Sequence, residues 1–214
     1  SPALDHAVGR AVPADVAGAG GYGVFDLGQH SVVGLEAAHA DYVVVNAAGC
    51  SHHVKEYGHL LRCDPLYAQR AAALAAKTRD ITELLAELGP RPPKAALPWR
   101  VTYQEPCHLA HGQKITAQPR KVLAAIPGLD FIEMAESSMC CGSAGTYNIL
   151  QRDMAQQLLD RKLDNTAATH ATVVASANTG CMIQMRAGLA QRGVEARVLH
   201  VVEILDAAYQ LEAE

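Results

Sequence analysis

Cysteines are the residues of this 214-residue chain best suited to do chemistry. Four of the six stand in three groups, at Cys107, at the adjacent pair Cys140-Cys141 and at Cys181. Their thiolates are soft ligands that select zinc, copper(I) or iron–sulfur clusters. Six cysteines are too few to staple a chain of this size, so we expect metal binding rather than a disulfide framework.

The spacing of the four cysteines favours an iron–sulfur cluster over a single zinc ion. Structural zinc sites usually take two pairs of the CxxC kind, and no such pair is present. Adjacent cysteines cannot easily fill two corners of one compact tetrahedron, whereas a cluster offers several iron atoms to neighbouring thiolates. Zinc stays open as the alternative metal. Cys50 is a further candidate ligand, and Cys63 is expected to be an ordinary buried or exposed cysteine.

The elements that must position these cysteines alternate between short β-branched runs and helical patterns. This alternation predicts an α/β fold with parallel sheets flanked by helices. Strands are expected over 42–46, 99–103, 129–134, 172–176 and 194–199. Helices are expected over 65–88, 119–126, 148–164, 182–192 and 202–212.

Each of the three cysteine groups directly follows an expected strand. The carboxyl ends of parallel strands lie at one edge of a sheet, where ligands bind. We therefore expect three loops that are distant in sequence to bring Cys107, Cys140, Cys141 and Cys181 to one place. The pair and Cys181 also precede helices, whose N-termini favour negative charge.

A weak internal repeat predicts two related units. The segment that ends at Cys50 resembles the segment that ends at Cys181, and a similar signature follows each one after a helix. The two signatures are Asp80-Ile-Thr-Glu83 and His200-Val-Val-Glu203. We expect a first unit over 1–90, a proline-rich linker over 91–98 and a second unit over 99–214.

Composition excludes several classes of function. The formal net charge is −4 and no block of Lys and Arg stands out, so we expect no nucleic-acid partner. The longest uncharged run, 165–185, is rich in Thr, Ser, Asn and Gly and would not cross a bilayer. No secretory signal opens the chain, so a cytoplasmic protein is expected. Residues 18–23 match GxGxxG, but the flanking sequence is a poor strand and a poor helix, which predicts a loop.

Three motifs resemble the cysteine-rich CCG domain that occurs in heterodisulfide reductase and in the iron–sulfur subunit of glycolate oxidase. They are Pro106-Cys-His-Leu-Ala-His-Gly-Gln-Lys114, Cys140-Cys-Gly-Ser-Ala-Gly-Thr-Tyr147 and Asn178-Thr-Gly-Cys181. The long second motif, together with Asn46-Ala-Ala-Gly-Cys50 and Lys55-Glu-Tyr-Gly-His59, resembles the glycolate oxidase branch most. The resemblance covers about residues 42–212, and several motifs agree in order.

This resemblance implies an electron-transfer subunit that is not catalytic alone. It implies an iron–sulfur cluster, of the 4Fe-4S type, held by Cys107, Cys140, Cys141 and Cys181. A separate flavin subunit would oxidise a 2-hydroxy acid such as glycolate and pass electrons through iron–sulfur centres to a membrane quinone. The protein would then be cytoplasmic, or peripheral at the inner face of the membrane.

The chain departs from the family pattern in three ways. The first unit is incomplete, because it lacks its Cys-Cys pair and keeps only Cys50. No ferredoxin-like cysteine runs are present, and His53 and Gln184 stand where the fullest pattern has a second cysteine. These departures indicate the C-terminal part of such a subunit, or a degenerate form of it.

Two other functions stay open at this point. The first is a non-redox module, with zinc or without metal, that holds partner subunits together. The second is a thiol-dependent enzyme in which Cys107 or Cys141 is the nucleophile and His108 is the base.

Overall fold

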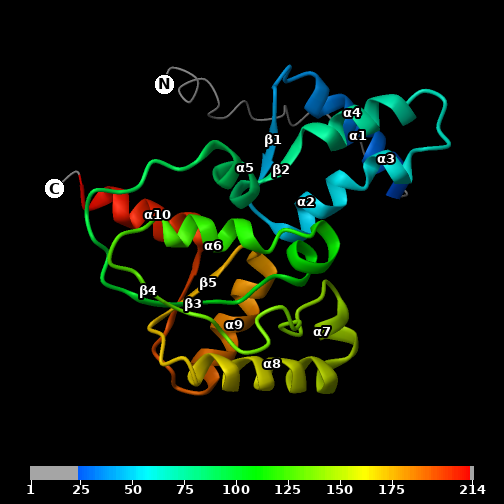
Figure 1. Ribbon diagram of the computed structural model, residues 1–214. Coiled ribbons are helices and arrows are strands. Elements are labelled where there is room, and N and C mark those ends of the chain that lie inside the picture. Colours follow the sequence, from blue (N-terminus) through cyan, green and yellow to red (C-terminus); the bar gives the residue numbers. More distant parts are fainter. Residues whose placement is uncertain (1–23, 213–214) are drawn as a thin grey trace. The chain divides into compact units, whose positions relative to one another are not determined.

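The computed structural model describes residues 24–212, so the expected loop at residues 18–23 lies outside the described part. The chain separates into two compact units, which are described individually (Figure 1). One comprises residues 1–43 and 53–78, and the other comprises residues 44–52 and 79–214. The second unit contains Cys107, Cys140, Cys141, Cys181 and Cys50. The predicted division into repeat units around residues 91–98 stays a prediction.

A four-stranded parallel sheet forms the centre of the second unit. Its strand order is β4-β3-β5-β6, with β3 over Arg100–Tyr103, β4 over Asp130–Ile132, β5 over Val173–Ser176 and β6 over Arg197–His200. Each neighbouring pair is parallel, and in register Val101 lies opposite both Phe131 and Val173. The predicted α/β fold is therefore confirmed.

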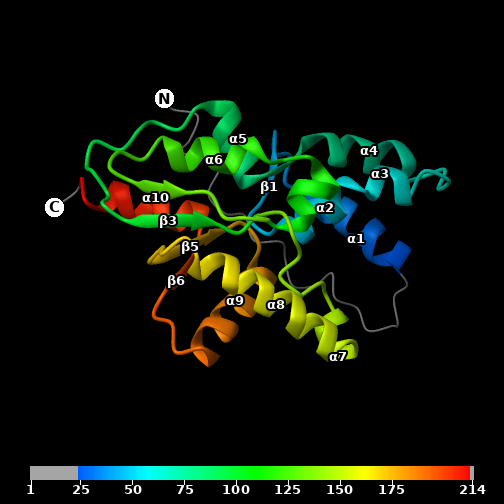
Figure 2. The ribbon, with the colours of Figure 1, turned by 60° about the horizontal axis from the view of Figure 1, so that its bottom comes forward.

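Helices cover both faces of this sheet (Figures 1 and 2). On one face α6 (Ala117–Ala124) and α10 (Val201–Gln210) pack against a core that includes Val173 and Ala175. On the other face α8 (Arg152–Ala167) and α9 (Thr179–Gln191) pack against a core that includes Val174. Successive residues of β5 thus enter opposite cores, because side chains alternate along a strand.

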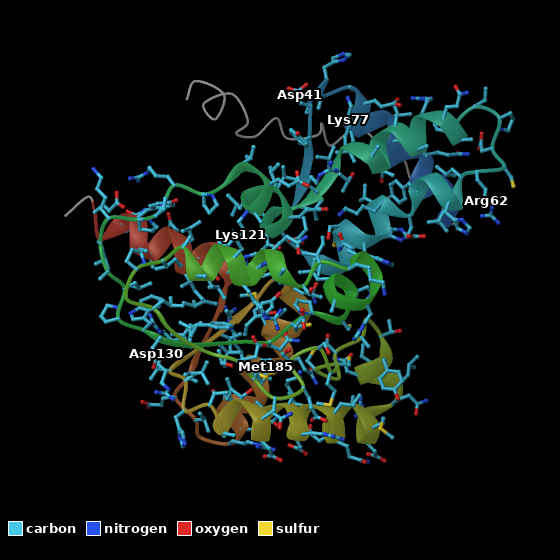
Figure 3. All side chains as sticks on the ribbon, in the orientation of Figure 1. Asp41, Arg62, Lys77, Lys121, Asp130 and Met185 are labelled. Atoms are coloured by element: carbon cyan, nitrogen blue, oxygen red, sulfur yellow. The ribbon has the colours of Figure 1, made fainter. Side chains whose placement is uncertain are left out.

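Met185 belongs to the core formed by α8 and α9, and Figure 3 shows it on that side of the sheet. Two short elements complete this part of the unit. A π-helix over His108–Gln113 follows Cys107, and α7 spans Tyr147–Leu150. The π-helix was not expected from the sequence, and α7 and α8 together take the place of the single helix expected over 148–164.

The remaining strands, β1 (Val43–Val45) and β2 (Thr78–Asp80), form a two-stranded sheet. Helix α2 (Ala48–Lys55) follows β1, and α5 (Ile81–Leu88) follows β2. The first unit holds α1 (Val24–Glu36), α3 (Tyr57–Leu60) and α4 (Ala68–Lys77). Its core is small and aliphatic except for one tyrosine: Val32, Tyr57, Leu61, Ala71 and Leu74.

Two sequence-based expectations about helices were wrong. The helix expected over 65–88 is divided into α4, β2 and α5, because Thr78 turns to extended backbone and Asp80 begins a new helix. The sequence after residue 23 has the pattern of a poor helix former, but α1 begins there at Val24. At the first place a local capping box at Asp80 starts a new helix, and at the second a helix forms in spite of its weak local pattern.

The repeat signatures are helix N-caps of the same kind. The Asp80 carboxylate accepts a hydrogen bond from Thr82 N, and Glu83 accepts one from Asp80 N. At the corresponding place His200 accepts from Val202 N and Glu203 accepts from His200 N. Both are capping boxes, which satisfy N–H groups that a helix start leaves free.

None of the helices in the described part of the chain combines the length and apolarity that crossing a bilayer requires.

A charged network holds the ends of β3 and β4 together. Arg120 of α6 donates to Glu105, which follows β3, at 2.9 Å, and to Glu133, which follows β4, at 2.6 Å. The Glu105 side chain is only 5% exposed, and its backbone N–H donates to Ser137 O. The loops that carry Cys107 and Cys140 therefore leave the sheet from a fixed base.

Replacing Arg120 with Met is expected to destabilise the protein by about 3 kcal/mol, because it leaves Glu105 buried without its cation. Urea unfolding at pH 7 measures this loss. Arg120 also lowers the pKa of Glu133, so the part of the stability that this pair contributes is present above the ordinary pKa of 4.5 and disappears as pH falls below it.

Arg100→Met is the matched control. Arg100 pairs with Asp130, labelled in Figure 3, between the same two strands, but both side chains are about half exposed. Exposed pairs contribute at most about 1 kcal/mol. If both variants lose the same amount of unfolding free energy, the buried contact between Arg120 and Glu105 does not stabilise the protein more than an exposed ion pair does.

Candidate metal centre

Three loops at the carboxyl edge of the four-stranded sheet carry the four predicted thiols. Cys107 is the N-cap of the π-helix after β3, Cys140 and Cys141 lie in the loop after β4, and Cys181 lies in the first turn of α9 after β5. These strands are adjacent in the sheet, so their loops leave it side by side. Cys141 and Cys181 are buried, whereas Cys107 and Cys140 are half-buried.

The four sulfurs form a chain of hydrogen-bonding partners, in the order Cys107, Cys140, Cys141, Cys181. Hydrogen bonds from Cys107 and Cys141 lower the pKa of Cys140 to about 2. A hydrogen bond from Cys141 also lowers the pKa of Cys181. The same bonds, together with burial, raise the pKa values of the two donors, Cys107 and Cys141. These hydrogen bonds favour the thiolate form of Cys140 and Cys181 over that of Cys107 and Cys141.

Polar groups of the protein stabilise the two thiolates further. Gly142 N–H donates to the Cys140 sulfur at 3.3 Å. The amide Nδ2 of Asn178 donates to the Cys181 sulfur, also at 3.3 Å. Hydrogen bonds to sulfur favour the deprotonated form that a metal requires.

Gly142 allows the loop to approach α8 closely. Its φ is +86°, a left-handed conformation that side chains disfavour, and a Cβ here would lie 2.3 Å from the carbonyl oxygen of Ala155. The second cysteine of the pair is therefore packed against α8 only because glycine follows it. The sequence motif contains this glycine, and the structure supplies the reason for it.

The segment that carries Cys50 is attached to the same loops. Ala48 N donates to Ala177 O, and Gly49 N donates to Asn178 Oδ1 at 3.2 Å. Gln113, in the π-helix after Cys107, donates to Ala48 O and to Ser51 Oγ. Cys50 itself is exposed and takes no part in the chain of sulfurs, so its role as a ligand stays a prediction.

Other residues considered from the sequence lie outside the chain of sulfurs. Cys63 is exposed and belongs to the other compact unit. Gln184 accepts a hydrogen bond from Asn148, and the ring of His53 contacts that of Tyr57 edge to face. The positions that hold a second cysteine in the fullest family pattern are thus occupied by side chains with other partners.

His108 is placed beside Cys107 without activating it. The His108 Nδ1 atom lies 3.7 Å from the Cys107 sulfur, and its ring packs edge-on against that of His52. The hydrogen bond to Cys140, together with burial, raises the pKa of Cys107, which is the opposite of the lowered pKa that a nucleophilic cysteine needs. This arrangement gives the thiol-enzyme alternative no support.

Sequence reasoning missed two residues of this site, Asn178 as a hydrogen-bond donor to sulfur and Lys162 of α8. Lys162 is fully buried, and its ammonium group interacts electrostatically with Cys140, Cys141 and Cys181. Asn178 could have been found as the residue before a helix that carries a cysteine. The surroundings of Lys162 in the sequence, Asp160, Arg161 and Asp164, resemble an exposed helix face and hide it.

The donor set fits an iron–sulfur cluster. Within residues 24–212 no three His, Cys, Asp or Glu side chains are grouped to hold a metal ion, so the fit depends on the chemistry of the donors. Four cysteine sulfurs, two N–H donors aimed at sulfur and one buried cation suit a negatively charged, thiolate-bound group. Cys107, Cys140, Cys141 and Cys181 would hold it.

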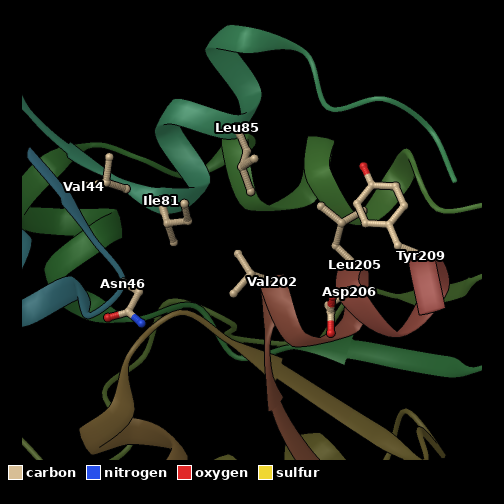
Figure 4. Close-up of a pocket in the computed structure, with 8 residues that line it drawn as sticks. All are labelled: Val44, Asn46, Ile81, Leu85, Val202, Leu205, Asp206 and Tyr209. Atoms are coloured by element: carbon tan, nitrogen blue, oxygen red, sulfur yellow. The ribbon is translucent and has the colours of Figure 1, made fainter. Parts of the chain in front are cut away.

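A separate groove of about 630 Å³ lies between α5 and α10 (Figure 4). Its lining is mainly aliphatic, with Asp206, Asn46 and Tyr209 as the polar contributors. None of the residues that line it is a cysteine. The thiols and the groove are therefore distinct features of the second unit.

Comparison with known proteins agrees with the arrangement of the cysteines. Residues 101–186, which contain all four thiols, match the family described as CCG, cysteine-rich domain. The chain is 30% identical over 181 residues to lactate utilization protein A of an Exiguobacterium strain and covers 74% of that protein. The chain belongs to the CCG cysteine-rich family.

Other relatives of this CCG protein carry two kinds of name. It is 38% identical over 184 residues to the probable glycolate oxidase iron-sulfur subunit of Bacillus subtilis, and it spans 41% of that protein's length. It is 32% identical to lactate utilization protein A of Lysinibacillus sphaericus, of which it spans 74%. The resemblance to the glycolate oxidase iron–sulfur subunit is thereby confirmed.

Replacing Gly142 of the CCG motif with Ala is expected to destabilise the protein by about 3 kcal/mol. The left-handed φ costs about 1 kcal/mol or more, and displacing the Ala155 carbonyl adds about 1–3 kcal/mol of overpacking. Urea unfolding of purified protein measures the change.

Gly145→Ala is the control that separates the cost of the left-handed backbone from the cost of the clash with α8. Gly145 also has a left-handed φ, +64°, but nothing lies within 4 Å of its added Cβ. We expect a loss of about 1 kcal/mol from the backbone alone. If Gly145→Ala destabilises the protein as much as Gly142→Ala, the contact with α8 is not what requires glycine.

Proposed function

We propose that this protein is an electron-transfer subunit, or the C-terminal part of one, that holds an iron–sulfur cluster in a complex that oxidises a 2-hydroxy acid. The chain of four sulfurs at the carboxyl edge of one parallel sheet is the observation that carries this proposal. A bound cluster of the 4Fe-4S type would take up and release single electrons. The protein's own residues supply its thiolate ligands.

The surroundings of the sulfurs support an electron relay better than catalysis by the protein itself. The two thiolates receive hydrogen bonds from Gly142 and Asn178, which hold negative charge in place without offering a proton-transfer group. Burial and the hydrogen bond to Cys140 raise the pKa of Cys107 in the metal-free protein, which argues against a free nucleophilic role for it. In this proposal, substrate oxidation takes place on a separate flavin subunit, and electrons leave towards a quinone.

The names of the relatives support a short 2-hydroxy acid as the class of substrate. Glycolate and lactate both appear in them, and the two acids share a hydroxyl group next to a carboxylate. The choice between them would lie with the flavin subunit. We therefore propose the class for the complex and assign no substrate contact to this chain.

Anaerobically purified protein is expected to be brown and to contain iron and acid-labile sulfide. Replacing Cys107, Cys140, Cys141 or Cys181 with Ser should weaken iron binding by about 10- to 100-fold or more, since even outer partners of a metal site have effects of that size. Visible absorption and iron analysis measure this. Colourless protein that contains zinc would support the non-redox alternative instead.

Cys63→Ser is the control and should leave iron content unchanged, because Cys63 lies in the other compact unit. Cys50→Ser should have little effect if the sulfur chain alone holds the cluster. If Cys50→Ser removes as much iron as Cys181→Ser, then Cys50 belongs to the site. Full iron content in Cys141→Ser would contradict a ligand role for both members of the pair.

The isolated protein is expected to show no oxidation of glycolate or lactate with an artificial electron-accepting dye, because the proposed flavin site is on another subunit. Dye reduction should begin when a matching flavoprotein is added. Substrate-dependent turnover by this chain alone, in preparations free of flavin, would overturn the electron-relay role.

A further inference from the structure

Lys162 is a fully buried lysine, with 0% of its surface exposed. An isolated ammonium group is very costly to bury unless an opposite charge or several hydrogen bonds compensate it. Such residues are rare in protein interiors. The contacts of this side chain therefore need an explanation.

Hydrogen bonds account for part of the compensation. The Lys162 ammonium donates to the carbonyl oxygens of Glu136 at 2.8 Å and of Ser137 at 2.9 Å. The Glu136 carboxylate accepts hydrogen bonds from Arg161 and Asn165 near the surface, and its charge acts on Lys162 less strongly than the charges of the cysteines do. Carbonyl groups supply only partial negative charge, so the full positive charge of Lys162 is not balanced by them.

The thiol site supplies most of the negative charge that acts on Lys162. Lys162 lies on α8 between Leu159 and Leu163, and both leucines belong to the core cluster that contains Cys141 and Cys181. The carbonyls that it binds belong to the loop that leads into the cysteine pair. Burial lowers the pKa of Lys162. The charges of the three neighbouring cysteines act in the opposite direction, and that of Glu136 does so less strongly.

We infer that Lys162 is the buried countercharge of the cluster and raises its reduction potential. This inference rests on the proposed function. One electron added to the cluster, with no proton, increases its negative charge by one. A fixed cation in a low-dielectric interior stabilises that reduced form more than the oxidised form, so the midpoint potential rises.

The inference is tested by redox titration of the reconstituted full chain, with dithionite as the reductant. Lys162→Met keeps the length of the side chain and removes its charge. Lys162→Gln removes the charge but keeps an N–H donor for the loop carbonyls. Both variants are expected to shift the reduction equilibrium at least about tenfold towards the oxidised form, which is about 59 mV for one electron.

Lys121→Met is the matched control. Lys121 of α6, labelled in Figure 3, also donates to a backbone carbonyl, Ala86 O at 2.8 Å, but it is exposed and packs against α5 rather than the thiol loops. Its replacement should leave the midpoint potential unchanged. An equal shift in this variant would show that the effect is not specific to the buried site and would overturn the inference.

The remaining outcomes distinguish an effect of the positive charge of Lys162 from an effect of its hydrogen bonds and packing. A wild-type potential in Lys162→Gln would show that only the hydrogen bonds matter and would overturn the inference. If neither Lys162 variant retains iron, the melting temperatures of the metal-free variants are compared with that of the metal-free wild type. Unchanged melting temperatures would support the countercharge inference, and loss of folding would overturn it. Wild-type protein that binds no iron would instead reject the proposed function itself.

Discussion

The parallel pairing of β3 with both β4 and β5 determines where the rest of the site can lie. Because the three strands run in the same direction, their loops leave the sheet at one edge and bring four sulfurs within hydrogen-bonding range. A strand that ran the other way would send its cysteine to the opposite edge. The Arg120 network then keeps the ends of β3 and β4 at a constant separation.

Negative charge is the second constraint on this region. Thiolates at the edge of a core need partners, and the protein supplies them from different elements: Gly142 N–H from the loop, Asn178 from the start of α9 and Lys162 from α8. The same groups suit a thiolate-bound cluster, whose charge is also negative. The polarity of the site is thus part of the fold and does not depend on the cysteines alone.

The two halves of the sequence repeat use the same local devices and are joined by hydrogen bonds. Capping boxes at Asp80 and His200 begin α5 and α10, and the loop before Cys50 is bonded to the loop before Cys181. Of the two sheets in residues 24–212, however, only the four-stranded one has three cysteine-bearing strand ends. This difference explains why the proposed cluster is assigned to the four-stranded sheet while the Cys50 segment supports it.

The sequence alone determined every strand of residues 24–212 except β2, most helices and the position of each of the three cysteine groups after a strand, because periodicity and turn residues act over a few neighbours. The division at Thr78–Asp80 was missed although its signal, the capping-box sequence Asp80-Ile-Thr-Glu83, is local, because the helical pattern runs continuously through it. The sequence could not show the order of the sulfurs or the burial of Lys162. Those features depend on contacts between residues far apart in the chain, and only the tertiary structure decides which of them meet.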